Sequence, residues 1–79
     1  MKKSEILIQL NELFKEVLDN ESIVLNGKTS MDTLDDWDSL THVQLILSIE
    51  KKFNICFTSV EIQECRNVSL LIKVIASKH

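Results

Sequence analysis

The sequence lacks proline and tyrosine, and glycine occurs once among its 79 residues. Proline and glycine supply the turns of small β-sandwiches and are enriched in disordered segments, so their scarcity argues against both classes. No run approaches the roughly 20 apolar residues of a transmembrane helix. Hydrophobic residues make up 44% and charged residues 27%, which is ordinary for a globular domain. An all-α fold is therefore expected.

Basic residues are also few. Nine Lys and Arg against twelve Asp and Glu give a formal net charge of −3. Nucleic-acid binding needs clustered basic residues, so we expect no nucleic-acid partner. Cys56 and Cys65 lack the spacing of a metal site, and without a signal-peptide core at the N-terminus they are expected to be free thiols. We expect a cytoplasmic monomer without membrane insertion.

Hydrophobic periodicity and capping patterns predict four helices. Apolar residues recur at helical spacing in the first helix, with Asn11 and Glu12 on its opposite side. Thr58 and Glu61 form a capping-box pattern, which predicts a short third helix, and Asn67 is placed as the N-cap of the last one. The expected helices span residues 3–18, 39–53, 59–65 and 68–77. Residues 1–79 should thus form one small four-helix bundle with three main helices and a short third one.

The long loop over residues 19–38 shows no sustained periodicity. A loop of this length in so small a domain usually has a function. It carries apolar residues that are expected to hold it against the helices: Ile23, Val24, Leu25, Met31, Leu34 and Trp37. Trp37 is expected either to anchor the loop or to recognise a partner.

The helix predicted at residues 39–53 has more apolar surface than one core contact needs. Its core-facing stripe is expected to contain His42, Leu45, Ile46, Ile49 and Phe53. A second group, formed by Leu40, Val43 and Leu47 together with Glu50, lies beside that stripe. This group either packs under the long loop or forms an exposed docking surface next to Ser39.

Ser39 stands where this helix is expected to begin. Its hydroxyl would lie near unpaired backbone N–H groups at the positive end of the helix, a setting that suits a phosphate, although three nearby aspartates would repel one. Serine is also a good N-cap, and position alone favours that role.

No catalytic residue and no metal ligand is predicted. His42 follows Ser39 by one turn, but no third group is placed to orient it for Ser–His catalysis, so we expect a partly buried histidine with its hydrogen bonds made. The aspartates before Ser39 do not match an EF-hand loop. A chain of 79 residues buries only about 60% of its unfolded surface, which leaves little room for an enclosed active site.

Two segments resemble the acyl carrier protein family. The stretch from Leu34 to Leu45, LDDWDSLTHVQL, followed by EKKFNI from Glu50, is similar to that family's phosphopantetheine site and second helix. The resemblance extends over nearly the whole chain through the order of the helices. It implies that Ser39 carries a 4′-phosphopantetheine arm, transferred from coenzyme A by a phosphopantetheinyl transferase. The cargo would be an acyl or aminoacyl group, held as a thioester for partner enzymes.

The resemblance also implies a recognition surface. Asp38 and Leu40 match residues next to the attachment serine, while Val43, Leu47 and Glu50 match positions that contact partner enzymes. Phe57 and Ile62 match positions that frame the opening toward the interior in carriers that shelter their cargo. The expected partners are the transferase, a loading ligase or transferase, and a downstream synthase or transferase.

The sequence departs from housekeeping fatty-acid carriers at several positions. Thr41 and Gln44 stand where acidic residues are common, as do Lys51 and Lys52, and Asp36 replaces a familiar glycine. These departures imply a specialised carrier for a polyketide, peptide, surface-glycan or cell-wall pathway. Gln44 is also similar to D-alanyl carriers, so a D-alanyl or peptidyl carrier is the alternative. A different class, an unmodified helical adaptor that binds proteins through the second apolar group, stays open.

Overall fold

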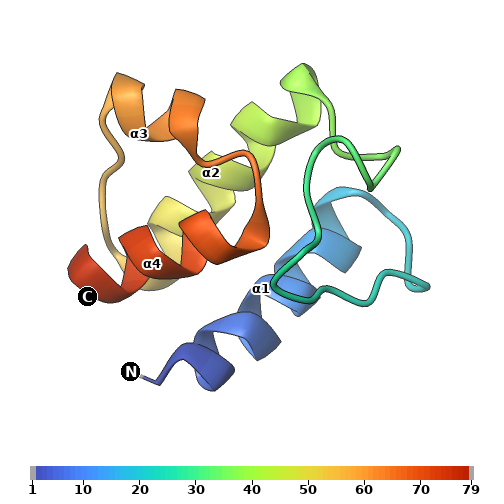
Figure 1. The fold of residues 1–79 in the computed structure, drawn as a ribbon, viewed down its shortest axis with the longest axis horizontal. Coiled ribbons are helices and arrows are strands. Elements are labelled where there is room, and N and C mark those ends of the chain that lie inside the picture. Colours follow the sequence, from blue (N-terminus) through green and yellow to red (C-terminus); the bar gives the residue numbers. More distant parts are fainter. Residues whose placement is uncertain (1, 79) are drawn as a thin grey trace.

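Four α-helices connected by loops make up residues 2–78, the part of the chain that the structure, a computed structural model, describes. Figure 1 shows them as α1 (Lys3–Val17), α2 (Ser39–Phe53), α3 (Ser59–Glu64) and α4 (Val68–Lys78). The predicted four-helix fold with a short third helix is confirmed. The predicted ends need correction by one residue: α1 and α3 end earlier than expected and α4 ends later. Within the described part of the chain, no helix is long and apolar enough to cross a membrane.

Side-chain caps and left-handed residues set several helix ends. The Thr58 hydroxyl accepts from the Glu61 N–H at 3.1 Å, and the Glu61 carboxylate accepts from the Thr58 N–H at 2.8 Å, as the capping box predicted. The Asn67 side chain accepts from the Leu70 N–H at 2.8 Å at the start of α4. The chain leaves α1 because Asp19 adopts a φ of 51°, which is outside the right-handed helical region.

The core lies where α1 packs against both α2 and α4. Burying one large apolar side chain stabilises the fold by about 1.5–3 kcal/mol relative to exposing it. The buried apolar residues of these helices are Ile6, Leu10, Leu13, Phe14, Leu45, Ile46, Ile49, Phe53, Val68, Leu71, Ile72 and Ile75. None of the residues of α3 is buried. Phe57 before this helix and Cys65 after it are buried, and they hold it against the core.

The loop before α2 is held against α1 by alternating side chains. Ile23 and Leu25 are buried, whereas Val24 between them is 81% exposed, so the expectation that Val24 packs on the helices is wrong. In extended backbone, successive side chains point to opposite sides. The Asn11 side chain fixes this arrangement by donating to the Ile23 carbonyl at 3.3 Å and accepting from the Leu25 N–H at 2.6 Å.

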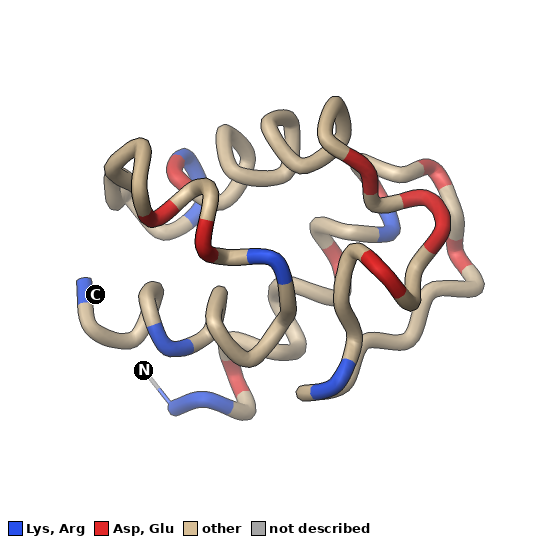
Figure 2. The backbone as a smooth tube through the Cα atoms, turned by 45° about the horizontal axis from the view of Figure 1, so that its top comes forward, with Lys and Arg blue, Asp and Glu red and all other residues tan. Residues whose placement is uncertain are grey.

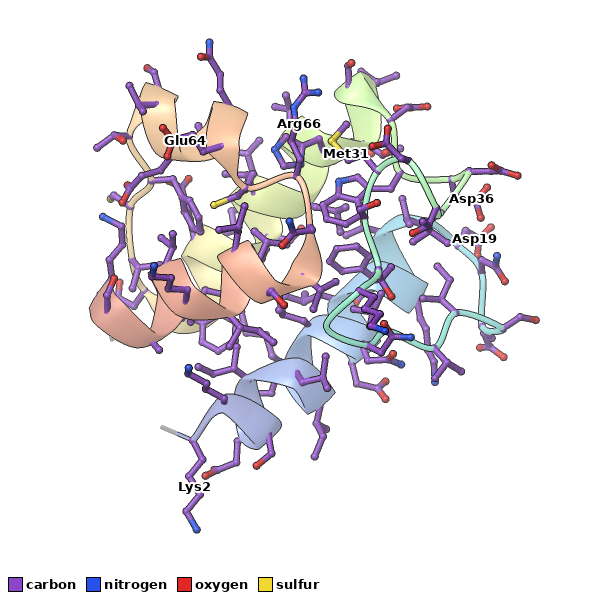
Figure 3. All side chains as sticks on the ribbon, viewed as in Figure 1. Lys2, Asp19, Met31, Asp36, Glu64 and Arg66 are labelled. Atoms are coloured by element: carbon purple, nitrogen blue, oxygen red, sulfur yellow. The ribbon has the colours of Figure 1, made fainter. Side chains whose placement is uncertain are left out.

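The middle of the same loop is joined to the connection between α3 and α4. Ser30 and Asn67 form an isolated antiparallel bridge, and the Met31 N–H donates to the Arg66 carbonyl at 3.0 Å. Met31 and Arg66 lie side by side where the two segments meet (Figure 3). This bridge fixes the path by which the loop approaches α2.

Candidate functional site

Asp38 and Thr41 cap the N-terminus of α2. The Asp38 carboxylate accepts from the backbone N–H groups of Thr41 at 2.9 Å and Leu40 at 3.0 Å, and the Thr41 hydroxyl accepts from the Asp38 N–H at 2.8 Å. Hydrogen bonds from the Thr41 backbone, the Thr41 hydroxyl and the Leu40 backbone lower the pKa of Asp38 below its ordinary value of 3.8. The capping role of Thr41 was missed, although the Asp-x-x-Thr spacing signals it.

Ser39 is therefore the first residue of the helix, and the position-based expectation that it serves as the N-cap is wrong. Its side chain is exposed, and within residues 2–78 its hydroxyl makes no hydrogen bond. The positive end of a 15-residue helix lies beside it. A hydroxyl in this place can be converted to a phosphate ester without the loss of a hydrogen bond of the described fold.

The second apolar group of α2 is exposed. Leu40, Val43 and Leu47 have exposed fractions of 71%, 51% and 54%, and Gln44 beside them is exposed as well. The alternative that these residues pack under the long loop is thus wrong. They form an apolar strip that begins next to Ser39 and continues along the helix.

His42 points into the core, and both of its ring nitrogens are hydrogen-bonded there. The indole N–H of Trp37 donates to His42 Nδ1 at 3.0 Å, which leaves Nε2 as the protonated nitrogen that donates to the Ile62 carbonyl at 2.7 Å. His42 is 7% exposed and Trp37 is 1% exposed. The ring of Trp37 also packs edge-on against Phe14, with 4.9 Å between centroids. Trp37 is thus the loop anchor, and neither nitrogen of His42 is available to act as a base for Ser39.

Glu50, which was predicted to contact partner enzymes, lies with Phe57 and Ile62 between α2 and the α3 segment and outside the exposed strip. The half-buried Glu50 accepts from the Phe57 N–H at 2.8 Å, and Phe57 itself is buried. Ile62 is partly buried and supplies the carbonyl that His42 binds. The structure therefore divides the predicted surface into an exposed set next to Ser39 and an internal set that holds α3.

Acidic side chains gather on the loop that leads to Ser39. Figure 2 shows red segments along this loop, whereas Lys51 and Lys52 stand at the opposite end of α2. Asp35, Asp36 and Asp38 are all exposed, and Asp36 accepts from the Asn20 side chain at 2.9 Å. Among the described residues, no cluster of His, Cys, Asp and Glu could hold a metal ion.

Comparison with known proteins identifies the family. A family model described as a phosphopantetheine attachment site matches residues 9–75. The chain belongs to the acyl carrier protein family. The solution structure of a holo acyl carrier protein from Geobacter metallireducens is 40% identical to this carrier, with a TM-score of 0.84 over 91% of this chain and 83% of that one. No curated protein matches the carrier significantly.

The fold of this carrier also recurs at lower sequence identity. The crystal structure of an acyl carrier protein from Thermotoga maritima is 20% identical, with a TM-score of 0.86 over 99% of this chain and 91% of that one. Family membership means that the protein is a carrier and not a catalyst, and that its cofactor is covalently attached 4′-phosphopantetheine. It also means that the carrier interacts with transferases and synthases.

Proposed function

We propose that the 4′-phosphopantetheine arm is attached to Ser39. The observation that supports this choice is the division of roles at the start of α2. Asp38 and Thr41 take up the capping hydrogen bonds, and this leaves the Ser39 hydroxyl exposed and unpaired within residues 2–78. The adjacent helix end favours the negative charge of a phosphodiester.

In the loading step, the Ser39 Oγ attacks the phosphorus that carries the pantetheine of coenzyme A. The new Oγ–P bond replaces the bond to adenosine 3′,5′-bisphosphate, which leaves, and the hydroxyl proton passes to a base of the transferase. Once attached, the arm supplies a terminal thiol that binds the cargo as a thioester. The three aspartates before Ser39 repel the phosphodiester and favour an arm that points away from the loop.

The carrier acts in a specialised pathway and not in housekeeping fatty-acid synthesis. Thr41 is used by the helix cap, Gln44 is neutral and Lys51 is basic, so α2 lacks an acidic side chain at these three positions, where housekeeping fatty-acid carriers commonly have one. The whole chain serves as one carrier domain in the cytoplasm, where coenzyme A is available. Its loading enzyme transfers an acyl or aminoacyl group, and a D-alanyl or peptidyl cargo is the alternative.

Intact mass after incubation with coenzyme A and a broad-specificity phosphopantetheinyl transferase tests the attachment site. The wild-type carrier is expected to gain about 340 Da, the mass of the arm, and Ser39→Ala is expected to gain nothing. Ser59→Ala is the matched control, because Ser59 is also an exposed first residue of a helix, following the capping residue Thr58. A modified Ser39→Ala protein, or a wild type that several transferases leave unmodified, contradicts the proposal.

If the attachment at Ser39 fails this test, an unmodified adaptor protein is the function that would replace the proposed one. In that case the wild type resists the transferases and still binds a protein through Leu40, Val43 and Leu47. Circular dichroism of Ser39→Ala should match the wild type, because the hydroxyl makes no hydrogen bond within the described residues.

A further inference from the structure

A row of neighbouring aromatic rings fills the interior beside Ser39. A helix turns by about 100° per residue, so His42, three positions after Ser39, lies about 60° away from it around α2 and nearly one turn further along. The ring centroid of His42 is 5.9 Å from that of Trp37, and the centroid of Trp37 is 4.9 Å from that of Phe14 in α1. The exposed fractions of His42, Trp37 and Phe14 are 7%, 1% and 0%. The row therefore reaches from α2 to α1.

Hydrogen bonds extend this row to α3. His42 accepts from the Trp37 indole N–H at 3.0 Å and donates to the Ile62 carbonyl at 2.7 Å. Further along α2, the Glu50 carboxylate accepts from the Phe57 N–H at 2.8 Å, just before α3 begins. These links hold the α3 segment against α2 at two points. The seam between α2 and α3 is thus closed by His42 at the end that carries Ser39.

Opening this seam would separate polar groups that are largely buried. If α3 moved away from α2, the Ile62 carbonyl or the Trp37 indole N–H would lose its partner. A buried polar group without a partner destabilises a fold more than the burial of one methylene stabilises it. A cargo of about two to four carbons has too few methylenes to offset this loss. A long chain would also need the volume that Trp37 and Phe14 fill, and a close-packed interior accommodates added volume poorly.

We propose that this carrier holds its cargo outside the bundle, and that the cargo is a small polar acyl or aminoacyl group. This inference rests on the proposed attachment at Ser39. His42 acts as a positioning residue, because it keeps α3 closed over the core. A long alkyl chain held outside would expose apolar surface to water, whereas a small polar group stays hydrated there. The carrier therefore suits short polar cargo and not long fatty acyl chains.

Carriers loaded with cargo of two lengths test the proposal. A broad-specificity transferase attaches the arm from acetyl-coenzyme A or from octanoyl-coenzyme A, and intact mass verifies one group per chain. Urea unfolding of the two loaded forms is then followed by circular dichroism. A wild type that gains no mass overturns the attachment at Ser39 and this inference with it. Loaded forms that differ in stability overturn this inference alone.

The two loaded forms of the wild type should have urea midpoints within about 0.2 M of each other, because neither cargo is buried. His42→Ala removes the link across the seam, so its octanoyl form should unfold at least about 0.5 M above its acetyl form. Ile6→Ala is the matched control. Ile6 is buried in α1 about two turns from Phe14, so its replacement weakens the core without opening the seam and should give the wild-type result.

Stabilisation of the wild type by the octanoyl group would overturn the proposal. This comparison needs no substitution, so it decides the outcome even where His42→Ala does not fold. An octanoyl group that stabilises Ile6→Ala as much as His42→Ala, or that stabilises neither, would overturn the role of His42 in closing the interior.

Discussion

At the scale of single residues, the start of α2 assigns helix capping to Asp38 and Thr41 and leaves Ser39 for the proposed attachment of the arm. The Asp38 carboxylate accepts two backbone hydrogen bonds and the Thr41 hydroxyl accepts one from the Asp38 N–H, so the cap is made without the Ser39 hydroxyl. A serine that capped the helix would have to give up its hydrogen bond when it became an ester. The capping box therefore makes the proposed attachment at Ser39 independent of the stability of the helix.

Asp38 gives a prediction for the dependence of stability on pH. Its lowered pKa means that its contribution to folding is fully present above the unfolded value of 3.8 and is lost as the pH falls through the lower folded value. Asp38→Asn keeps a capping oxygen but no charge, so it should unfold at lower urea than the wild type at about pH 7. The difference should shrink as the pH falls toward about 3. Urea titrations followed by circular dichroism measure this difference in stability at each pH. A difference that stays constant between about pH 7 and about pH 3 would count against the predicted role of the Asp38 charge.

At the scale of the elements, α3 depends on its neighbours because it has six residues and none of them is buried. Isolated helices of this length are not stable in water. His42 of α2 binds the Ile62 carbonyl near the end of α3, and Trp37 of the loop holds His42 in place. One buried imidazole thus joins the loop, α2 and α3, so α3 should open more readily than the other helices when this link is lost.

Replacing His42 tests the link. His42→Ala leaves the Trp37 indole N–H and the Ile62 carbonyl without their partner, and it should lower the free energy of unfolding by about 2–4 kcal/mol. Trp37 is the single tryptophan, so its fluorescence reports the transition in urea. The exposed Lys52→Ala is the control and should stay within about 0.5 kcal/mol of the wild type. Amide exchange should increase more in α3 than in α4, and a loss below about 1 kcal/mol would speak against the link.

At the scale of the whole molecule, one core joins the loop to α1, α2, α4 and the residues on either side of α3. Cys65 lies in this core with 1% of its surface exposed, whereas Cys56 is exposed. Burial, with the negative charges of Glu61 and Glu64, raises the pKa of the Cys65 thiol to about 11. The thiol of Cys65 should therefore react only when the whole core opens.

Alkylation of the unmodified carrier tests this expectation. With iodoacetamide at about pH 8, the folded protein should gain one group, at Cys56, because the thiolate is the reactive form and Cys65 is both protonated and covered. In urea above the unfolding midpoint it should gain two. Intact mass and peptide mapping identify the sites. Rapid modification of Cys65 in the folded protein would show that the segment after α3 opens by itself.

The sequence by itself determined the elements and the family. Helical periodicity and the capping box at Thr58 and Glu61 are local patterns, so they placed four helices with an error of one residue at three ends. The core stripe of α2 and the inward direction of His42 followed from the same geometry. The residues around Ser39, together with the order of the predicted helices, indicated an acyl carrier protein.

The tertiary structure decided which side chains are covered and which are bound. Leu40, Val43 and Leu47 are equally apolar whether or not a loop lies over them, and only the path of the loop leaves them exposed. Asn11 was expected on the outer side of α1, but it holds the loop because Ile23 and Leu25 come beside it in the fold. Such contacts join residues far apart in the chain, and local patterns carry no information about them. The surface next to Ser39 is exposed because contacts elsewhere in the fold lead the loop away from it.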